Sequence, residues 1–382
     1  MDKEEKIRKL LTRGVIEIIG REDLEDKIRK GKKLRVKFGV DVARPDLHLG
    51  HSVGLRKLRE FQELGHTVIF LIGDATTRIG DPTGKDKTRP ILTEEEIQRN
   101  AKTYTDQVGK ILDVKKCEIR RNSEWFDKMS MFDFVNLLTM VTHSQIMNRE
   151  AFRKRIKEGK EIFVHELVYP VMQGYDSVVL KADVAVHADQ LFNEHFGRLY
   201  QEKFGQEPQA IMTLPMLVGT DGKNKMSKSL DNYIGIAEPA DSQYGKIMSI
   251  PDTLLEEYYT LLTDLPFNKN ENPRDAKMKL AYEIVNMYHG KDEAERAREN
   301  FIKLFQKKEI PDDIPEIAAS KGVLLGDILV ENKIVVSKSE FRRLVKSGAV
   351  DVDGKAIVDI HFSIEKPVTV KIGKRRFVKI KI

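Results

Sequence analysis

The feature that most constrains the fold is a strand–helix–strand pattern near the start of the chain. The run TVIFLI, from Thr67 to Ile72, is continuously apolar and rich in β-branched residues, which is typical of a strand buried on both faces. It follows an alternating segment over 34–40 and a helical periodicity over 49–64 that ends at Gly65. Strand, helix and strand in this order form a βαβ unit, so the pattern predicts a parallel α/β sheet. Ligands are then expected beyond the carboxyl ends of the strands.

The rest of the chain predicts more than one domain, because 382 residues exceed one ordinary domain. The residue pair Asn272-Pro273 fits a helix cap followed by a first-turn proline. The segment EIPDDIP, over 309–315, is typical of a linker, and a short helix, a basic helix and several short strands are expected after it. The other expected elements are a helical lead-in over the first 30 residues, mostly helix over 93–160, strands at 183–186 and 210–218, and helices over 241–308.

Charge is concentrated at one end of the chain. The formal charge is +6, yet from Lys321 onward there are 14 basic and 7 acidic side chains, a local net charge of +7. A polyanionic partner is therefore expected for this end. The single cysteine, Cys117, excludes an intramolecular disulfide or a cysteine-based zinc site, and it favours a reducing, cytoplasmic location. The charged N-terminus and the lack of an apolar run of about 18–20 residues predict neither a secretory signal nor a membrane partner.

Two motifs point to chemistry on phosphates. The first, His48-Leu49-Gly50-His51, follows the predicted strand and opens the predicted helix, where backbone N–H groups bind anions. Its imidazoles, three residues apart on one face, can stabilise charge on phosphates, although alone the motif also fits two polar residues at a helix start. The second, Lys225-Met226-Ser227-Lys228-Ser229, lies in a polar loop whose two lysines can close on a triphosphate. Alone, it also fits a solvated lysine loop.

In this order and about 175 residues apart, the two motifs resemble the signature pair of class I aminoacyl-tRNA synthetases, and over its whole length the chain resembles the bacterial tyrosyl enzymes. The resemblance implies an α/β fold with three domains. These are a Rossmann-like parallel-sheet catalytic domain over 1–235 with a helical insertion at about 93–165, an α-helical anticodon-binding domain with the linker over 236–315, and a small α+β RNA-binding domain over 316–382. The implied activity is that of a tyrosine–tRNA ligase, which forms tyrosyl-adenylate from L-tyrosine and ATP and transfers tyrosine to the 3′ end of tRNA(Tyr).

A third set of residues bears on the amino acid. Tyr169, Gln173 and Asp176 share one face of a helix expected over 169–179, in which Pro170 would fall in the first turn. By the resemblance, Asp176 accepts a hydrogen bond from the phenol of tyrosine. Tyr169 and Gln173 hold the α-ammonium group together with Asp81. The resemblance implies this tyrosine-binding set: Lys37, Gly39, Asp81, Tyr169, Gln173 and Asp176.

The resemblance also assigns the nucleotide site, with ATP accompanied by Mg²⁺ and no metal held by the protein itself. The catalytic residues are His48, His51, Lys225 and Lys228. The ATP-binding residues are Asp41, Gly50, His51, Lys85, Asp189, Gln190 and Lys228. The chain departs from the family pattern at Val186-His187-Ala188, where two glycines are usual, and at Ala43, where a threonine is common. Arg44, next to Ala43, is a candidate to supply charge to the triphosphate.

The basic tail resembles a small RNA-binding domain, and its predicted tRNA-binding residues are Lys338, Arg342, Arg343, Lys346, Lys374, Arg375 and Arg376. The resemblance further implies a homodimer formed through the insertion around 125–163, with no DNA partner. Two alternatives stay open at this stage: a tryptophan-specific synthetase, and an RNA-binding protein on an inactive synthetase scaffold. Exchange of pyrophosphate into ATP with each amino acid separates the three.

Overall fold

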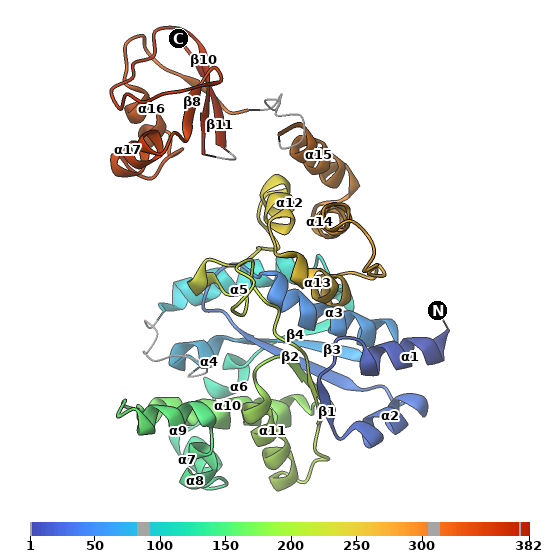
Figure 1. Ribbon diagram of the computed structural model, residues 1–382. Helices are drawn as coiled ribbons and strands as arrows, with labels where there is room; N and C mark the ends of the chain where they lie inside the picture. Colours follow the sequence, from blue (N-terminus) through green and yellow to red (C-terminus); the bar gives the residue numbers. More distant parts are fainter. Residues whose placement is uncertain (1, 82–91, 305–313, 374–375) are drawn as a thin grey trace. The chain divides into compact units, whose positions relative to one another are not determined.

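A computed structural model describes residues 2–81, 92–304, 314–373 and 376–382 (Figure 1). The chain divides into two compact units, one up to Arg298 and one from Glu299 onward. The predicted boundary between the first two domains, at 235/236, therefore lies inside the first unit.

The first unit contains a six-stranded sheet in the order β1-β6-β5-β2-β3-β4. All neighbours in it are parallel except β1, which runs antiparallel to β6. The strands are β1 (Glu17–Ile19), β2 (Arg35–Asp41), β3 (Thr67–Gly73), β4 (Cys117–Arg121), β5 (Val184–His187) and β6 (Ala210–Thr213). From β2 the chain moves to β3 and β4 on one side and later returns to β5 and β6 on the other. This reversal between β2 and β5 is where an open α/β sheet forms its ligand crevice.

Helices cover both faces of this sheet, with α3 on one side and α10 and α11 on the other (Figure 1). The helices up to α8 are α1 (Lys3–Thr12), α2 (Arg21–Arg29), α3 (Leu49–Glu63), α4 (Asp74–Ile79), α5 (Glu94–Val108), α6 (Ser123–Phe126), α7 (Met131–Leu138) and α8 (His143–Met147). The next are α9 (Glu150–Lys157), α10 (Val164–Leu180), α11 (Leu191–Lys203), α12 (Ala240–Met248), α13 (Leu255–Leu262), α14 (Pro273–His289) and α15 (Lys291–Ile302). Short 3₁₀ turns are η1 (Val114–Lys116), η2 (Lys228–Leu230) and η3 (Asp252–Leu254).

The core of the first unit explains why β2, β3 and α3 follow the sequence pattern so closely. The side chains of Val36, Ile69 and Phe70 are fully buried, as the continuous apolar run predicts. Helix α3 packs close to the sheet at Gly54, where an added Cβ would lie 2.4 Å from the Phe38 ring. The helix thereby brings its N-terminus, which carries the first motif, to the carboxyl end of β2.

Three local predictions were wrong. The lead-in contains the short edge strand β1 between α1 and α2, where helix was expected. The segment over 93–160 is mostly helical as predicted, and its short edge strand β4, CEIRR, is too polar to show a buried strand pattern. Helix α10 begins at Val164, five residues before the predicted start, because the Glu166 carboxylate accepts the Phe163 N–H at 2.8 Å. Pro170 therefore lies inside the helix and not in its first turn.

The second unit is a small α+β domain. Its sheet has the order β7-β11-β10-β8-β9, with α16 and α17 packed against it. The elements are β7 (Glu316–Ala318), α16 (Leu325–Glu331), α17 (Lys338–Lys346), β8 (Val350–Val352), β9 (Lys355–Ala356), β10 (Val368–Ile372) and β11 (Arg376–Lys381). Phe341 and Val345 of α17 lie in its apolar core, as predicted for the packed face of the basic helix.

Candidate active site

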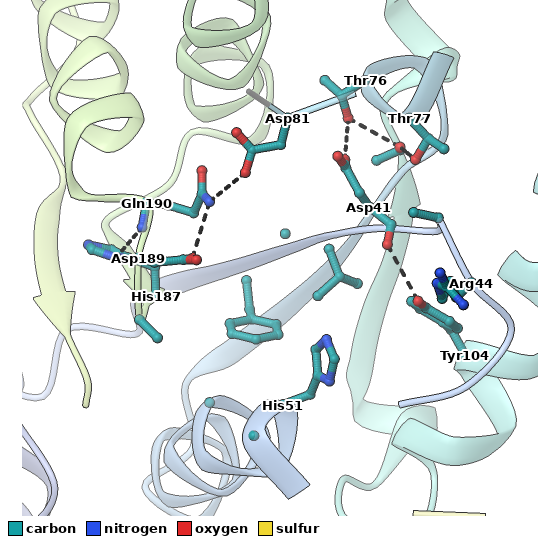
Figure 2. A pocket seen from close by; sticks show the side chains of 18 of the residues that line it. Asp41, Arg44, His51, Thr76, Thr77, Asp81, Tyr104, His187, Asp189 and Gln190 are labelled. Atoms are coloured by element: carbon teal, nitrogen blue, oxygen red, sulfur yellow. Dashed lines mark hydrogen bonds between the residues drawn. The ribbon is translucent and has the colours of Figure 1, made fainter. Parts of the chain in front are cut away.

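A cavity of about 990 Å³ opens at the carboxyl ends of β2 and β5, where the sheet topology places a ligand site. Figure 2 shows residues from these strands and from α3, α4 and α5 around it. Most of the residues predicted from the sequence lie together on its walls. They are Lys37, Gly39, Asp41, His48, Gly50, His51, Asp81, Tyr169, Gln173, Asp176, Asp189, Gln190 and Lys228. Lys85 lies outside the described residues.

The first motif forms the N-terminus of α3. His48 is the N-cap and its Nδ1 accepts the Gly50 N–H at 3.2 Å, while the His51 Nδ1 accepts the His48 N–H at 3.2 Å. An added Cβ at Gly50 would lie 2.9 Å from the His48 ring, so this position needs glycine. Since each Nδ1 is an acceptor, both rings carry their proton on Nε2.

Both imidazoles of this motif are neutral near pH 7. Burial, followed by the charges of His51, Lys228 and Lys225, lowers the pKa of His48 to about 2. Burial and Lys228 lower the pKa of His51 to about 4. The motif therefore lines the cavity with N–H donors and not with fixed positive charges.

The two lysines of the second motif are held by carboxylates on opposite sides of the cavity. The Lys225 Nζ lies 3.3 Å from Asp189 Oδ2, after β5. The Lys228 Nζ donates to the Asp46 carbonyl oxygen at 2.5 Å and lies 3.4 Å from its carboxylate, before α3. Burial lowers the pKa of Lys228 despite Asp46.

Asp176 lies fully buried at the opposite end of the cavity. Its Oδ1 accepts the Trp125 indole N–H at 3.0 Å, and its Oδ2 accepts from Asn122 Nδ2 at 3.4 Å. Burial raises the pKa of Asp176 to about 8, although Lys37, Asn122 and Trp125 act to lower it. The carboxyl group is thus a buried hydrogen-bond partner that Trp125 and Asn122 already hold in place.

A buried ion pair supports this end of the cavity. The Lys37 Nζ lies 2.9 Å from Glu194 Oε2 and donates to Ser177 Oγ at 2.7 Å, with Lys37 only 1% exposed. Burial acts to raise the pKa of Glu194, but Lys37 and its other partners hold it below its usual value. Glu194 Oε1 also accepts from Gln173 Nε2 at 2.8 Å, which turns the Gln173 oxygen toward Asn193.

Two carboxylates line the middle of the cavity. The Tyr169 hydroxyl donates to Asp41 Oδ2 at 3.1 Å, and Thr76 donates to Asp41 Oδ1 at 2.9 Å. Asp81 accepts from Gln190 Nε2 at 2.9 Å and lies 3.2 Å from Arg149 of the insertion. Figure 2 shows Asp41 and Asp81 on either side of the cavity, each held by its partners.

His187, whose role the sequence left unassigned, ends β5 and lies 4% exposed. Its Nδ1 accepts the Gln190 backbone N–H at 3.0 Å. The imidazole therefore braces the loop that carries Asp189 and Gln190.

Comparison with known proteins decides the family. Residues 29–306 match the family model described as class I tRNA synthetases (W and Y), and residues 306–379 match the C-terminal domain model of tyrosine–tRNA ligases. The chain is 50% identical to the tyrosine–tRNA ligase of Thermotoga maritima and 47% identical to that of Carboxydothermus hydrogenoformans. Each alignment covers 100% of this chain and 98% of the relative. The chain belongs to the tyrosine–tRNA ligase family.

Solved structures of tyrosyl-tRNA synthetases share the fold. A C-terminally truncated mitochondrial enzyme of Aspergillus nidulans matches with a TM-score of 0.66 at 24% identity, over 78% of this chain and 94% of its own. The enzyme of Archaeoglobus fulgidus, solved with L-tyrosine, matches with a TM-score of 0.61 at 22% identity, over 78% of this chain and 100% of its own. The predictions of the α/β fold and of a tyrosine–tRNA ligase are confirmed, and the named relatives favour tyrosine over the tryptophan alternative.

The predicted tRNA-binding residues of this ligase fall into two groups. Arg342, Arg343 and Lys346 are exposed on α17, whereas Lys338 is exposed but paired with Asp327 at 2.7 Å. Arg376 is partly buried and donates to the Ile334 carbonyl and to Glu340, so it ties β11 to the helices. Lys374 and Arg375 lie outside the described residues.

Sequence reasoning missed several residues that build the ligase site. A signal was available for Glu194, because an acid on the buried face of α11 and a lysine in the apolar strand β2 each need an opposite charge. Of the others, Asn122, Trp125 and Arg149 come from the insertion, whereas Ser177 lies on α10 and Asn193 on α11. All five reach the site through tertiary contacts that leave no pattern in the sequence. The missed residues are Asn122, Trp125, Arg149, Ser177, Asn193 and Glu194.

Proposed function

We propose that the two ends of this cavity divide the activation of tyrosine between them. The observation that carries the proposal is that buried acceptors around Asp176 and the cluster of His48, His51 and Lys228 face one continuous cavity. L-tyrosine and Mg-ATP bind side by side, and a tyrosine carboxylate oxygen attacks the α-phosphorus. The bond to the β-phosphate oxygen breaks, pyrophosphate leaves, and tyrosyl-adenylate remains. The 3′-terminal ribose hydroxyl of tRNA(Tyr) then takes the tyrosyl group and AMP departs.

The amino-acid end selects tyrosine through its phenol. The phenolic O–H donates to Asp176, which also accepts from Trp125 and Asn122 and is thereby held in place. Asp81, Tyr169 and the Gln173 oxygen receive the α-ammonium group. Phenylalanine leaves the buried Asp176 acceptor without its partner, which costs on the order of 1.5–3 kcal/mol.

The nucleotide end stabilises the charge that develops on the phosphates. Neutral His48 and His51 donate from Nε2, because their Nδ1 atoms are engaged with the backbone. As the loop closes, Lys225 leaves Asp189 and Lys228 leaves Asp46. Both ammonium groups then bind the leaving pyrophosphate. Gly50 and Gln190 form the surface on which the nucleotide lies, with Asp41 and Asp189 at its edges and Lys85 supplying further charge, while Gly39 belongs to the tyrosine-binding set.

Mg²⁺ enters this scheme as a companion of the substrate. Among the described residues no cluster of three or more His, Cys, Asp or Glu side chains is arranged to hold a metal ion. The phosphate end carries lysines and imidazoles, which do not suit a hard cation. The residues present therefore do not fit a protein-held Mg²⁺, and phosphate oxygens coordinate the ion.

The test of the loop assignment is Lys228→Ala, with Lys223→Ala as a matched control in the same loop. Lys223 is exposed, and its side chain has no role in the proposal. Loss of one preorganised transition-state contact lowers the rate about 10²–10³-fold. Lys228→Ala should therefore lose ATP–pyrophosphate exchange to that extent, while Lys223→Ala stays near the parent rate. Normal exchange in Lys228→Ala removes the loop from catalysis.

We also propose that the ligase works as a cytoplasmic homodimer. The helical insertion exposes several large apolar side chains, which favour burial in an interface between copies. These are Met131, Phe132, Val135, Ile156, Phe163 and Val164. Phe132→Asp should convert the protein to a monomer in light scattering, whereas Val358→Asp, at a 90% exposed site in the second unit, should not. A dimer that survives Phe132→Asp refutes this surface.

Among the described residues, no helix is long and apolar enough to cross a membrane.

A further inference from the structure

His187 is a buried side chain that the proposed chemistry does not use. It lies at the carboxyl end of β5, on the wall of the cavity, and it is 4% exposed. Its Nδ1 accepts the backbone N–H of Gln190 at 3.0 Å, and its Nε2 lies 3.4 Å from Thr213 Oγ1 on the paired strand β6. The ring thus joins the sheet to the loop that follows β5.

The two contacts fix the tautomer of His187. Nδ1 can accept an N–H only when it carries no proton, so the proton resides on Nε2, from which it can be donated to Thr213. Burial lowers the pKa of His187, which keeps the ring neutral. The loop is therefore anchored by an acceptor that is present at neutral pH.

The anchored loop connects both halves of the reaction. Gln190 Nε2 donates to Asp81 at 2.9 Å, and Asp189 Oδ2 lies 3.3 Å from Lys225 (Figure 2 shows the first of these contacts). Gln190 Oε1 also accepts from Asn193 at 2.6 Å, and Asn193 donates to Gln173. A shift of the Gln190 backbone therefore moves groups that contact the amino acid and a group that holds the lysine loop.

We propose that His187 is a positioning residue that holds Gln190 and Asp189 in their productive places through the Nδ1 acceptor. The proposal rests on the roles proposed above for Gln190 and Asp189. If the ring only filled space, it would not need to accept the Gln190 backbone N–H at Nδ1. The His187 ring contributes one hydrogen bond to the Gln190 backbone. Loss of this bond should raise KM for tyrosine about 3- to 10-fold.

The test is a matched pair of amide substitutions in the full-length protein. In His187→Asn the side-chain oxygen can occupy the place of Nδ1 and keep the acceptor for Gln190. In His187→Gln the amide reaches the place of Nε2, toward Thr213, and leaves the Gln190 N–H without its partner. Thr213→Val removes only the Nε2 contact. Steady-state pyrophosphate exchange gives kcat and the KM values for tyrosine and ATP, and active-site titration counts the folded, competent sites.

The expected result is a 3- to 10-fold rise in KM for tyrosine in His187→Gln, with the parent value kept within about twofold in His187→Asn and Thr213→Val. Equal effects of the Asn and Gln variants, or a loss confined to the fraction of active sites, overturn the proposal. Gln190→Ala distinguishes a failure of the His187 proposal from a failure of the role proposed for Gln190. If it raises KM for tyrosine while His187→Gln does not, the His187 inference alone fails. If Gln190→Ala changes nothing, the role proposed for Gln190 fails first.

Discussion

The buried pair between Lys37 and Glu194 gives a prediction whose size follows from the structure. Both residues are at most 3% exposed, and their charged atoms lie 2.9 Å apart. Glu194→Gln removes the negative charge and leaves the Lys37 ammonium in the core, where it still donates to the uncharged Ser177 hydroxyl. Breaking a buried ion pair in this way costs about 3–5 kcal/mol. For a unit of this size, that corresponds to a fall in Tm of roughly 5–8 °C.

Thermal unfolding followed by circular dichroism measures this cost. The matched control is Glu63→Gln, which breaks the exposed 3.0 Å pair with Arg59 and should cost less than about 1 kcal/mol. The double variant Lys37→Met/Glu194→Gln removes both charges and should recover much of the loss, because no unpaired charge remains buried. Equal effects of Glu194→Gln and Glu63→Gln would refute the reasoning. So would a double variant no more stable than Glu194→Gln alone.

Two further predictions concern pH and salt. The pKa of Asp176 is about 8 in the folded protein and 3.8 as an ordinary carboxyl group. The folded state therefore binds more protons between these values, and its stability falls as pH rises from about 4 to 8. The Tm advantage of Asp176→Asn over the parent should grow from pH 5 to pH 8, and a constant difference contradicts the burial argument. Replacing Arg342, Arg343 and Lys346 with alanine should flatten the salt dependence of tRNA binding by about two to three units of slope, whereas Lys355→Ala should not. An unchanged slope in the triple variant argues against α17 as an RNA contact.

The sequence predicted those elements whose side chains face a single environment. Strand β3 is buried on both faces, so Thr67–Gly73 appears as an unbroken apolar run. The edge strand β4 is half-buried and carries Glu118, Arg120 and Arg121. Because of these charged residues, its sequence lacks the apolar pattern by which a strand is recognised. Local capping explains the early start of α10, because the Glu166 side chain accepts the Phe163 backbone N–H. The spacing of apolar residues does not show this contact, so it did not reveal where the helix begins.

In the candidate site, too, some residues could be predicted from the sequence and others could not. His48, His51, Lys225 and Lys228 could be predicted because they form contiguous motifs with a fixed chemical purpose. The residues that orient them are contributed by other elements. Glu194 reaches Lys37 across 157 positions of sequence, and Trp125 reaches Asp176 across 51. Such partners become visible only when the fold brings them together.

The most direct test of the account is amino-acid-dependent ATP–pyrophosphate exchange with tyrosine, phenylalanine and tryptophan, performed on the parent and on Asp176→Ala. The parent should support exchange with tyrosine alone. Asp176→Ala should lose preference for tyrosine over phenylalanine by about 10- to 150-fold, because the buried acceptor for the phenol is gone. Exchange with tryptophan, no exchange at all, or unchanged discrimination in Asp176→Ala would contradict the central claim.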